Sequence, residues 1–268
     1  MSNLAEKHHS EEIFHDDWAS HIDIEDELVN ESFQSPTAIE NKYILKNIPC
    51  LEGKRILDLG CGAGHAAVYF ASKGADVYAG DISSIMLEKA NLLAEKYNVK
   101  IKTFKITAEK IDFEDNTFDY VYGNGVLHHT VITKTVQEVW RILKPSGRAF
   151  FIEPLSYNPI IELYRKIASA VRSPEESPFK YSDLRAIKKI FKKVIHKEFW
   201  FFSLYIFVHF YVVKRIDPAK ERYWKLVIKE GDKYKVLFVI LNFMDKIILP
   251  LLYPLRWLCW NTVLILEK

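Results

Sequence analysis

A short stretch, ILDLGCGAG at residues 56–64, carries the clearest structural signal in this chain. An apolar run that contains Asp58 leads into three glycines at alternate positions, Gly60, Gly62 and Gly64. Glycine lets the backbone turn tightly and lets a ligand approach it without interference from a Cβ atom. Between a strand and a helix N-terminus, such a turn offers backbone N–H groups to a polar ligand. A plain glycine-rich turn is the alternative, but the strand context and the acidic residue favour a binding loop.

The surrounding sequence alternates short apolar runs with helical patterns, which is typical of βαβ units and a parallel sheet. We expect strands at residues 55–59, 75–79, 100–106, 118–122, 148–153, 194–201 and 262–267. We expect helices at residues 66–73, 83–97 and 133–143, and helical spacing returns between about 204 and 261. This order of elements predicts an α/β fold.

The glycine spacing also distinguishes a loop that binds a dinucleotide from a loop that binds an adenosyl cofactor. A dinucleotide loop needs its third glycine at the position that holds His65, whereas this chain has it one place earlier, at Gly64. Asp81 follows at the end of the second expected strand, and nicotinamide and adenosyl cofactors both use such a carboxylate on ribose hydroxyls. Asp81 therefore does not discriminate between the two cofactors, while the glycine spacing and Asp58 do.

Residues 57–64 resemble motif I of the class I S-adenosylmethionine-dependent methyltransferases. Further segments resemble this family in the same order and at its spacing: GDIS at 80–83 with ML at 86–87, TAE at 107–109, FDYV at 118–121 with NGVLHH at 124–129, and WRILKPSGR at 140–148. The resemblance covers about residues 42–153 and is closest to quinone-biosynthesis C-methyltransferases and small-molecule methyltransferases. It implies a Rossmann-like, seven-stranded, mostly parallel sheet with helices on both faces and an antiparallel last strand.

Four parts of the chain follow from these patterns. We expect an acidic N-terminal arm at 1–40, an S-adenosylmethionine-binding Rossmann-like core at 41–203, an aromatic-rich helical insertion at 204–261 and a last core strand at 262–268. Arms often close over the cofactor in this fold, and insertions before the last strand often cover the substrate. By this analogy the arm and the insertion are both predicted to be lids.

The resemblance implies a cofactor-binding role for each matching position. The residues concerned are Asp58, Gly60, Cys61, Gly62, Gly64, Asp81, Ile82, Met86, Thr107, Ala108, Glu109 and Asn124. The glycine-rich loop would line the methionine part of S-adenosylmethionine, Asp58 would receive its amino group through water, and Asp81 would hold its ribose hydroxyls. The family usually has Asp where this chain has Thr107, so Glu109 is the alternative acceptor for the adenine amine.

Three side chains are candidates for catalysis: His128, His129 and Glu153. All three follow expected strands at the edge of the sheet where open α/β folds bind ligands. A sulfonium methyl is already activated, so a base is needed only if the acceptor must lose a proton. We prefer His129 for the substrate and His128 for structure. Loop shaping by both histidines and a capping or solvated role for Glu153 are the alternatives, and His15 of the arm is a further candidate.

Aromatic side chains are concentrated between residues 199 and 258. A second small core, a cavity for a large apolar acceptor and a shallow membrane-seating surface are all compatible with this density. Residues 185–193 predict an amphipathic helix with lysines on one face. A solvated surface helix and attraction to anionic lipid headgroups are both compatible with that helix. No His or Cys cluster has metal-ligand spacing, so we expect no metal site.

The net charge of +2 conceals a gradient along the 268 residues. Residues 1–40 carry a net charge of −10, residues 41–140 a net charge of 0, and residues 141–268 a net charge of +12. The acidic arm and the basic half are therefore expected to attract each other. Three cysteines, no signal-peptide pattern and no apolar run of spanning length predict a cytoplasmic protein, with peripheral membrane contact as an option.

Together these features predict a methyltransferase that uses S-adenosylmethionine and acts on a hydrophobic small molecule, such as an isoprenoid, lipid or polyketide-like acceptor. The basic C-terminal half favours an RNA-modifying methyltransferase as an alternative, although no DNA partner is expected. A non-catalytic subunit that binds S-adenosylmethionine is a third hypothesis.

Overall fold

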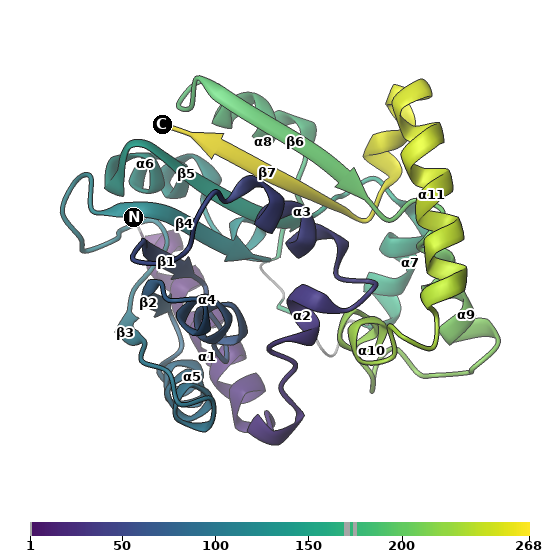
Figure 1. Cartoon of the computed structure of the whole chain (residues 1–268), viewed down its shortest axis with the longest axis horizontal. Coiled ribbons are helices and arrows are strands. Elements are labelled where there is room, and N and C mark those ends of the chain that lie inside the picture. The colour runs from purple at the N-terminus through teal and green to yellow at the C-terminus, as the bar shows by residue number, and fades with distance from the viewer. Residues whose placement is uncertain (1, 169–171, 174–175) are drawn as a thin grey trace.

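A seven-stranded sheet lies at the centre of the molecule, with helices on both sides of it (Figure 1). The computed structural model describes residues 2–168, 172–173 and 176–268. The strand order across the sheet is β3-β2-β1-β4-β5-β7-β6. The strands are β1 Arg55–Leu59, β2 Asp76–Asp81, β3 Lys102–Lys105, β4 Phe118–Asn124, β5 Leu143–Pro154, β6 Lys193–Phe199 and β7 Asn261–Glu267. Strands β1 to β5 pair in parallel, while β7 runs antiparallel to β5 and β6, which confirms the predicted fold class.

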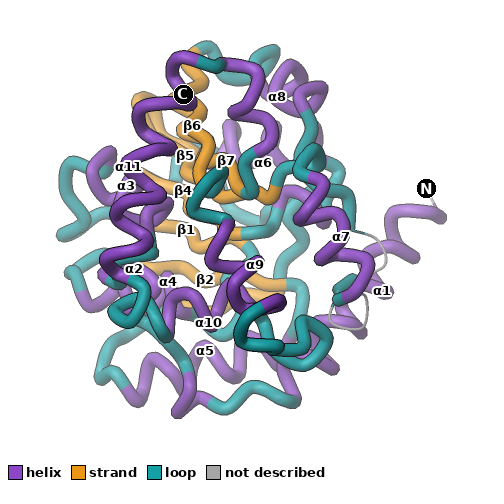
Figure 2. The backbone as a smooth tube through the Cα atoms, turned by 90° about the vertical axis from the view of Figure 1, so that its right-hand side faces the viewer, coloured by secondary structure: helices purple, strands orange, loops and turns teal. Residues whose placement is uncertain are grey.

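Helices wrap the sheet and form the ends of the molecule (Figure 2). The α-helices are α1 Ser2–Ser20, α2 Glu31–Gln34, α3 Ile39–Asn47, α4 His65–Ser72, α5 Ser84–Lys96, α6 Ile132–Ile142, α7 Pro159–Ile167, α8 Tyr181–Ile187, α9 Tyr205–Val212, α10 Tyr223–Lys229 and α11 Lys235–Leu251. Short 3₁₀ turns are η1 Ile24–Asp26, η2 Leu127–His129 and η4 Tyr253–Leu258. Local sequence signals explain where several helices begin. For example, the Ser83 hydroxyl accepts a hydrogen bond from Met86 N at 3.0 Å and caps α5.

The central strands are buried on both faces, which explains why they read as continuous apolar runs. Successive side chains of a strand point to opposite faces. Ile56 joins the core on the α4 side, and its neighbour Leu57 joins the core on the α6 side. The sheet thus separates two apolar layers, and its carboxyl edge remains free for a ligand.

Two predicted elements differ from the structure. The fifth strand begins at Leu143 rather than 148, because Leu143 pairs with Phe118 and the ladder then shifts register before Arg148. Residues 144–147 therefore belong to a strand with an irregular register. The predicted helix at 185–193 is wrong beyond Ile187, where α8 ends and the chain turns so that Lys193 begins the pairing of β6 with β7.

The arm and the insertion lie at different edges of the core but meet beside it. Helix α1 packs against α5, while α9, α10 and α11 gather at the right-hand side of Figure 1. The Thr37 hydroxyl donates to Val227 O at 2.8 Å, and the Ser35 hydroxyl donates to Ile228 O at 3.1 Å. These bonds connect residues 31–40 to α10, so the two segments together enclose the space above the carboxyl edge of the sheet.

Candidate functional site

The glycine-rich loop joins β1 to α4, and each of its glycines has a positive φ. The φ angles are 67° at Gly60, 51° at Gly62 and 87° at Gly64. A Cβ atom would lie 2.8 Å from Val126 Cγ2 at Gly60 and 2.7 Å from Ala90 Cβ at Gly64, so both positions need glycine for packing. At Gly62 a Cβ atom would meet nothing within 4 Å. Gly62 therefore presents bare backbone to open space.

Asp81 holds this loop in place from the end of β2. Its Oδ2 accepts from Gly62 N at 2.8 Å, and its Oδ1 accepts from Ser83 N at 2.9 Å. Burial raises the pKa of Asp81, although these backbone donors oppose the rise. Asp81 therefore links the glycine-rich loop to the start of α5.

Asp58 lies beneath the same loop, near the end of β1. Its Oδ2 accepts from Ala67 N at 2.9 Å, which connects the strand to α4. Burial raises the pKa of Asp58 to about 7, and the neighbouring Asp81 adds to the rise. A cation that entered this region would favour the ionised form of Asp58.

A cavity of about 1370 Å³ opens above the loop. It is bounded by α1, the glycine-rich loop, η2, α7 and α10. The predicted cofactor residues that line it are Asp58, Gly60, Cys61, Gly62, Asp81, Ile82, Met86, Thr107, Ala108, Glu109 and Asn124. Gly64 does not line it, and a Cβ atom there would meet Ala90 of α5, so the structure gives Gly64 a packing role, while its predicted ligand contact stays a prediction.

Glu153 occupies a different place from the one we expected. It is fully buried at the end of β5 and does not line the cavity. Its Oε1 accepts from Leu127 N at 2.8 Å and from Val126 N at 3.1 Å, and its Oε2 lies 2.7 Å from His128 Nδ1. Glu153 is thus a positioning residue that holds η2, because both of its oxygens are engaged by that turn.

His128 is buried between two carboxylates. Glu153 contacts its Nδ1, and Glu176 Oε1 lies 3.3 Å from its Nε2. Burial lowers the pKa of His128, but the two carboxylates outweigh burial and raise it to about 9. A charged histidine with both nitrogens engaged is a poor base, so a structural role for His128 stays our preferred prediction.

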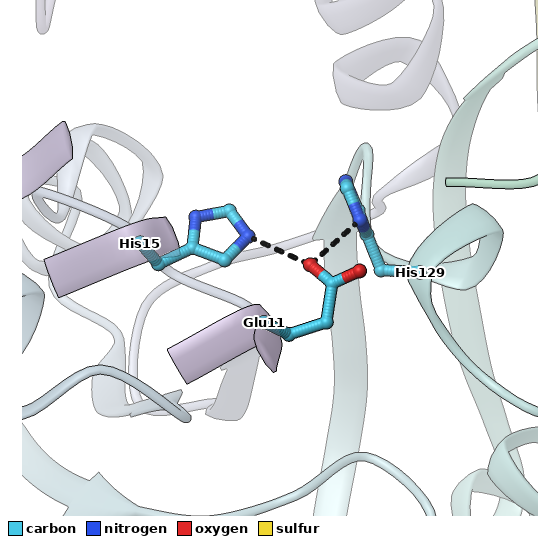
Figure 3. A group of neighbouring side chains, drawn as sticks. All are labelled: Glu11, His15 and His129. Atoms are coloured by element: carbon cyan, nitrogen blue, oxygen red, sulfur yellow. Dashed lines mark ion pairs between the residues drawn. The ribbon is translucent and has the colours of Figure 1, made fainter. Parts of the chain in front are cut away.

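His129 faces the cavity beside two side chains of the arm (Figure 3). Its Nδ1 lies 3.1 Å from Glu11 Oε2, and the same oxygen lies 3.5 Å from His15 Nε2. The rings of His15 and His129 meet edge to face at 5.4 Å. The three ligand atoms lie within 4.8 Å of one another, so this set is also the one that could hold a metal ion among the described residues.

Charge at this cluster follows from its burial. Burial and the neighbouring charge of His128 lower the pKa of His129, while Glu11 opposes them. Burial raises the pKa of Glu11, but His129 and His15 outweigh burial and hold that pKa well below its usual range. At neutral pH, therefore, His129 is largely neutral beside an ionised Glu11. Glu11 was missed from the sequence, where only its spacing of four from His15 on an acidic helix was visible.

The arm is tied to the core by polar side chains along α1. Glu109 Oε2 lies 3.0 Å from His8 Nε2, while its Oε1 accepts from Val131 N at 2.8 Å. The Ser83 hydroxyl donates to Asp16 of α1. Glu109 is thereby an anchor for the arm, and α1 forms a wall of the cavity.

The arm also meets the basic insertion, as the charge gradient predicts. Glu27 is buried between His65 and Lys225, with Lys225 Nζ at 2.8 Å. The guanidinium of Arg222 lies 3.6 Å from the centre of the Trp18 ring. Opposite charges in the arm and α10 therefore close this side of the cavity.

Comparison with known proteins shows which family this chain resembles in sequence and in fold. Residues 57–151 match the family model of the methyltransferase domain. YcgJ, a methyltransferase of Bacillus subtilis, is 30% identical over 134 residues, which cover 49% of this chain and 53% of YcgJ. The core of this chain belongs to the class I S-adenosylmethionine-dependent methyltransferases. The crystal structure of YcgJ has a TM-score of 0.52 at 20% identity, covering 84% of this chain and 96% of that one, and shows the fold.

Two further relatives of this methyltransferase core carry functional names. The ubiquinone biosynthesis O-methyltransferase of Alkalilimnicola ehrlichii is 35% identical over 119 residues, or 44% of this chain and 48% of that protein. The sterol 24-C-methyltransferase of Candida albicans is 26% identical over 172 residues, or 62% of this chain and 46% of that protein. The chain thus spans about half the length of the curated relatives it matches.

The residues of this methyltransferase core fit the family's cofactor, S-adenosylmethionine. Gly62 leaves space where any side chain would intrude, and two acidic side chains, Asp58 and Asp81, flank the loop. The cavity has room for the cofactor together with an acceptor, because single-ligand pockets are roughly 300–1,000 Å³.

Proposed function

We propose that this chain is an S-adenosylmethionine-dependent methyltransferase that moves the sulfonium methyl group by in-line displacement to a hydrophobic small molecule. The observation that carries the proposal is one cavity that joins the bare backbone of Gly62 to His129. The cofactor supplies an activated methyl group, so the protein's task is to place the acceptor in line with it.

The cofactor half of the cavity is assigned to the glycine-rich loop and its two carboxylates. Asp81 already accepts one backbone N–H on each oxygen, and a carboxylate oxygen has a further lone pair for a ribose hydroxyl. Asp58 provides negative charge for the amino group when it is ionised. Ile82 and Met86 offer apolar contact for a flat ring.

The acceptor half of the cavity is assigned to His129 and Glu11. A neutral His129 can take the proton that an acceptor hydroxyl or amine loses as the methyl group arrives. Glu11 Oε2, 3.1 Å from His129 Nδ1, then stabilises the imidazolium that forms. Glu11 is thus a positioning residue that acts through His129.

The acceptor is proposed to be hydrophobic because a group of apolar and aromatic side chains lines one part of the cavity, although charged side chains of α10 line another part. Ile161 and Tyr164 of α7 line it together with Trp200 and Trp260. The names of the ubiquinone and sterol methyltransferases among the relatives suit an apolar acceptor of this kind. An isoprenoid, lipid or polyketide-like molecule fits the lining.

Calorimetry with S-adenosylmethionine tests the cofactor part of the proposal. We expect saturable binding, weakened by Gly62→Val, in which a side chain would enter the open space. Gly53→Ala is the matched control, because Gly53 also has a positive φ with nothing within 4 Å but does not line the cavity. Absence of binding, or preferential binding of a nicotinamide cofactor, would refute the cofactor assignment.

Radiolabelled methyl transfer to a panel of quinone precursors, sterols and polyketides tests the acceptor. Label in an organic-extractable product supports the proposal. Label in RNA, with salt-sensitive RNA binding, would support an RNA-modifying enzyme instead. Cofactor binding without turnover would indicate a non-catalytic subunit. Turnover lost in EDTA and restored by zinc would assign Glu11, His15 and His129 to a metal ion rather than to proton transfer.

A further inference from the structure

Helix α11 is apolar on two opposite faces. One face is buried and carries Phe238, Asp245 and Leu249. The opposite face carries six apolar side chains that are between 48% and 76% exposed: Val236, Val239, Ile240, Phe243, Ile247 and Leu251. Their spacing of three and four residues places them in one stripe along the helix. We call this set the α11 stripe.

Exposed apolar side chains of two other helices lie at the same end of the molecule. Helices α7, α9 and α11 all lie at the right-hand side of Figure 1, the side that faces the viewer in Figure 2. The exposed apolar side chains of α7 and α9 are Ile160, Leu163, Ile167, Tyr205, Tyr211 and Val212. Scattered exposed apolar residues are normal, but an apolar stripe along one helix, such as the α11 stripe, marks an interaction site.

The charged side chains that α11 exposes are both positive. On α11, Lys235 and Lys246 are exposed, whereas Asp245 is buried and accepts from Phe202 N and from the Ser203 hydroxyl, each at 2.7 Å. Because the acid is turned inward and the lysines outward, the exposed side of α11 complements an anionic surface.

An apolar stripe flanked by lysines has the chemistry of a lipid-interface helix. Apolar side chains enter the boundary between headgroups and acyl chains, while lysine stems extend their charge to the anionic headgroups. Among the described helices, none is both long enough and apolar enough to cross a bilayer. Contact would therefore be confined to one leaflet.

We propose that the face formed by α7, α9 and the α11 stripe docks on an anionic lipid bilayer. Helix α7 then lies between the membrane and the cavity, because Ile161 and Tyr164 line the cavity while Ile160 and Leu163 are exposed. A hydrophobic acceptor dissolved in the bilayer would thus reach the cavity beside α7. This last point rests on the proposed function, whereas the docking itself does not.

Vesicle sedimentation of the full chain tests the docking. We expect binding to vesicles of phosphatidylcholine mixed with phosphatidylglycerol, and weaker binding to phosphatidylcholine alone. High salt should weaken binding to the mixed vesicles toward the level seen with phosphatidylcholine alone, because salt screens the attraction between lysines and anionic headgroups. The double variant Val239→Glu, Phe243→Glu should bind the mixed vesicles with an affinity lowered by about tenfold or more, because two charges would enter the apolar region.

Leu92→Glu is the matched control, because Leu92 is 51% exposed on α5, away from this face. It should bind vesicles as the unaltered protein does, and all variants should keep their affinity for S-adenosylmethionine, which shows that they are folded. If the unaltered protein failed to bind S-adenosylmethionine, the proposed function would be refuted. Vesicle binding would still test the docking on its own.

Three outcomes would overturn the docking proposal. They are no binding of the unaltered protein to anionic vesicles, equal binding of the double variant, and a stable dimer in lipid-free solution that the double variant dissociates. The last, measured by analytical ultracentrifugation, would assign the α11 stripe to a second copy of this chain instead of a membrane.

Discussion

His129 and Glu11 lie far apart in the sequence, yet the neutral imidazole of His129 lies beside the ionised carboxylate of Glu11 at the cavity. His129 is held on η2, which Glu153 fixes from below through the backbone of residues 126–128. Glu11 reaches it from α1, with its Oε1 accepting from the Ser173 hydroxyl at 2.6 Å. A base that is kept neutral by burial and oriented by a carboxylate suits proton removal near neutral pH.

Replacement of Glu11 by Gln should slow methyl transfer more than it weakens the binding of S-adenosylmethionine or of the acceptor. We expect kcat to fall roughly tenfold to a hundredfold, because the imidazolium of His129 loses its counter-charge. Loss of the carboxylate should also lower the pKa of His129 further, which an NMR titration of its ring protons would show. Glu12→Gln on the same helix is the control, since Glu12 pairs with Lys105. An unchanged His129 titration in Glu11→Gln would contradict this role.

Asp58 should make cofactor affinity depend on pH. Its pKa is raised to about 7, so the carboxyl is protonated at about pH 6 and ionised at about pH 8. Ionisation favours the cationic amino group of S-adenosylmethionine, and affinity measured by calorimetry should therefore rise with pH across this range. Because the carboxyl is protonated in the folded state but already ionised in the unfolded state between about pH 4 and pH 7, the free energy of unfolding should fall as pH rises from about 4 to 7 and then level off. Asp58→Asn should flatten both profiles.

Helix α1 shows how an element far from the cofactor loop in sequence completes the site. Its anchors run along one side: His8 to Glu109, Glu12 to Lys105 and Asp16 to Ser83. The apolar side chain of Ile13, by contrast, is exposed. Polar contacts therefore fix α1 against the core along this side.

Deletion of residues 2–20 should weaken S-adenosylmethionine binding by about tenfold or more and abolish turnover, because one wall of the cavity and Glu11 are removed. Calorimetry and labelled methyl transfer would measure the two effects. Ile13→Ser should leave both unchanged. A truncated chain with full affinity and turnover would show that the arm is only a solvated tail.

At the scale of the whole molecule, acidic side chains of the arm contact basic side chains of the insertion. Burial raises the pKa of Glu27, but His65 and Lys225 outweigh it and hold that pKa at about 2. Arg222 over Trp18 adds a second contact between the same segments. The basic half of the chain is thus partly neutralised by its own N-terminus, which weakens the argument for a nucleic-acid partner.

Replacement of Glu27 by Gln should lower the free energy of unfolding by about 3 kcal/mol, because Lys225 and His65 lose a buried partner. A lowered carboxyl pKa contributes stability above its usual value of about 4.5 that is lost as pH falls toward 2. Tm should therefore fall on acidification through this window, and less steeply in Glu27→Gln. Glu25→Gln, an exposed pair with Lys96, is the control; equal acid profiles for both variants would contradict the role of Glu27.

The sequence by itself determined the α/β core, the order of strands and helices along the chain near the cofactor loop, and the positions of Asp58, Gly62 and Asp81. These depend on local signals, namely glycine spacing, apolar runs and helix caps, which act between neighbours in the chain. Only the tertiary structure decided that Glu11 meets His129, that Glu153 supports a turn instead of touching a ligand, and that the helix predicted at 185–193 ends at Ile187. It also showed that the aromatic insertion is core on one side and an exposed apolar face on the other. Such features depend on which residues distant in sequence are packed together, and hydrophobic periodicity alone does not specify that.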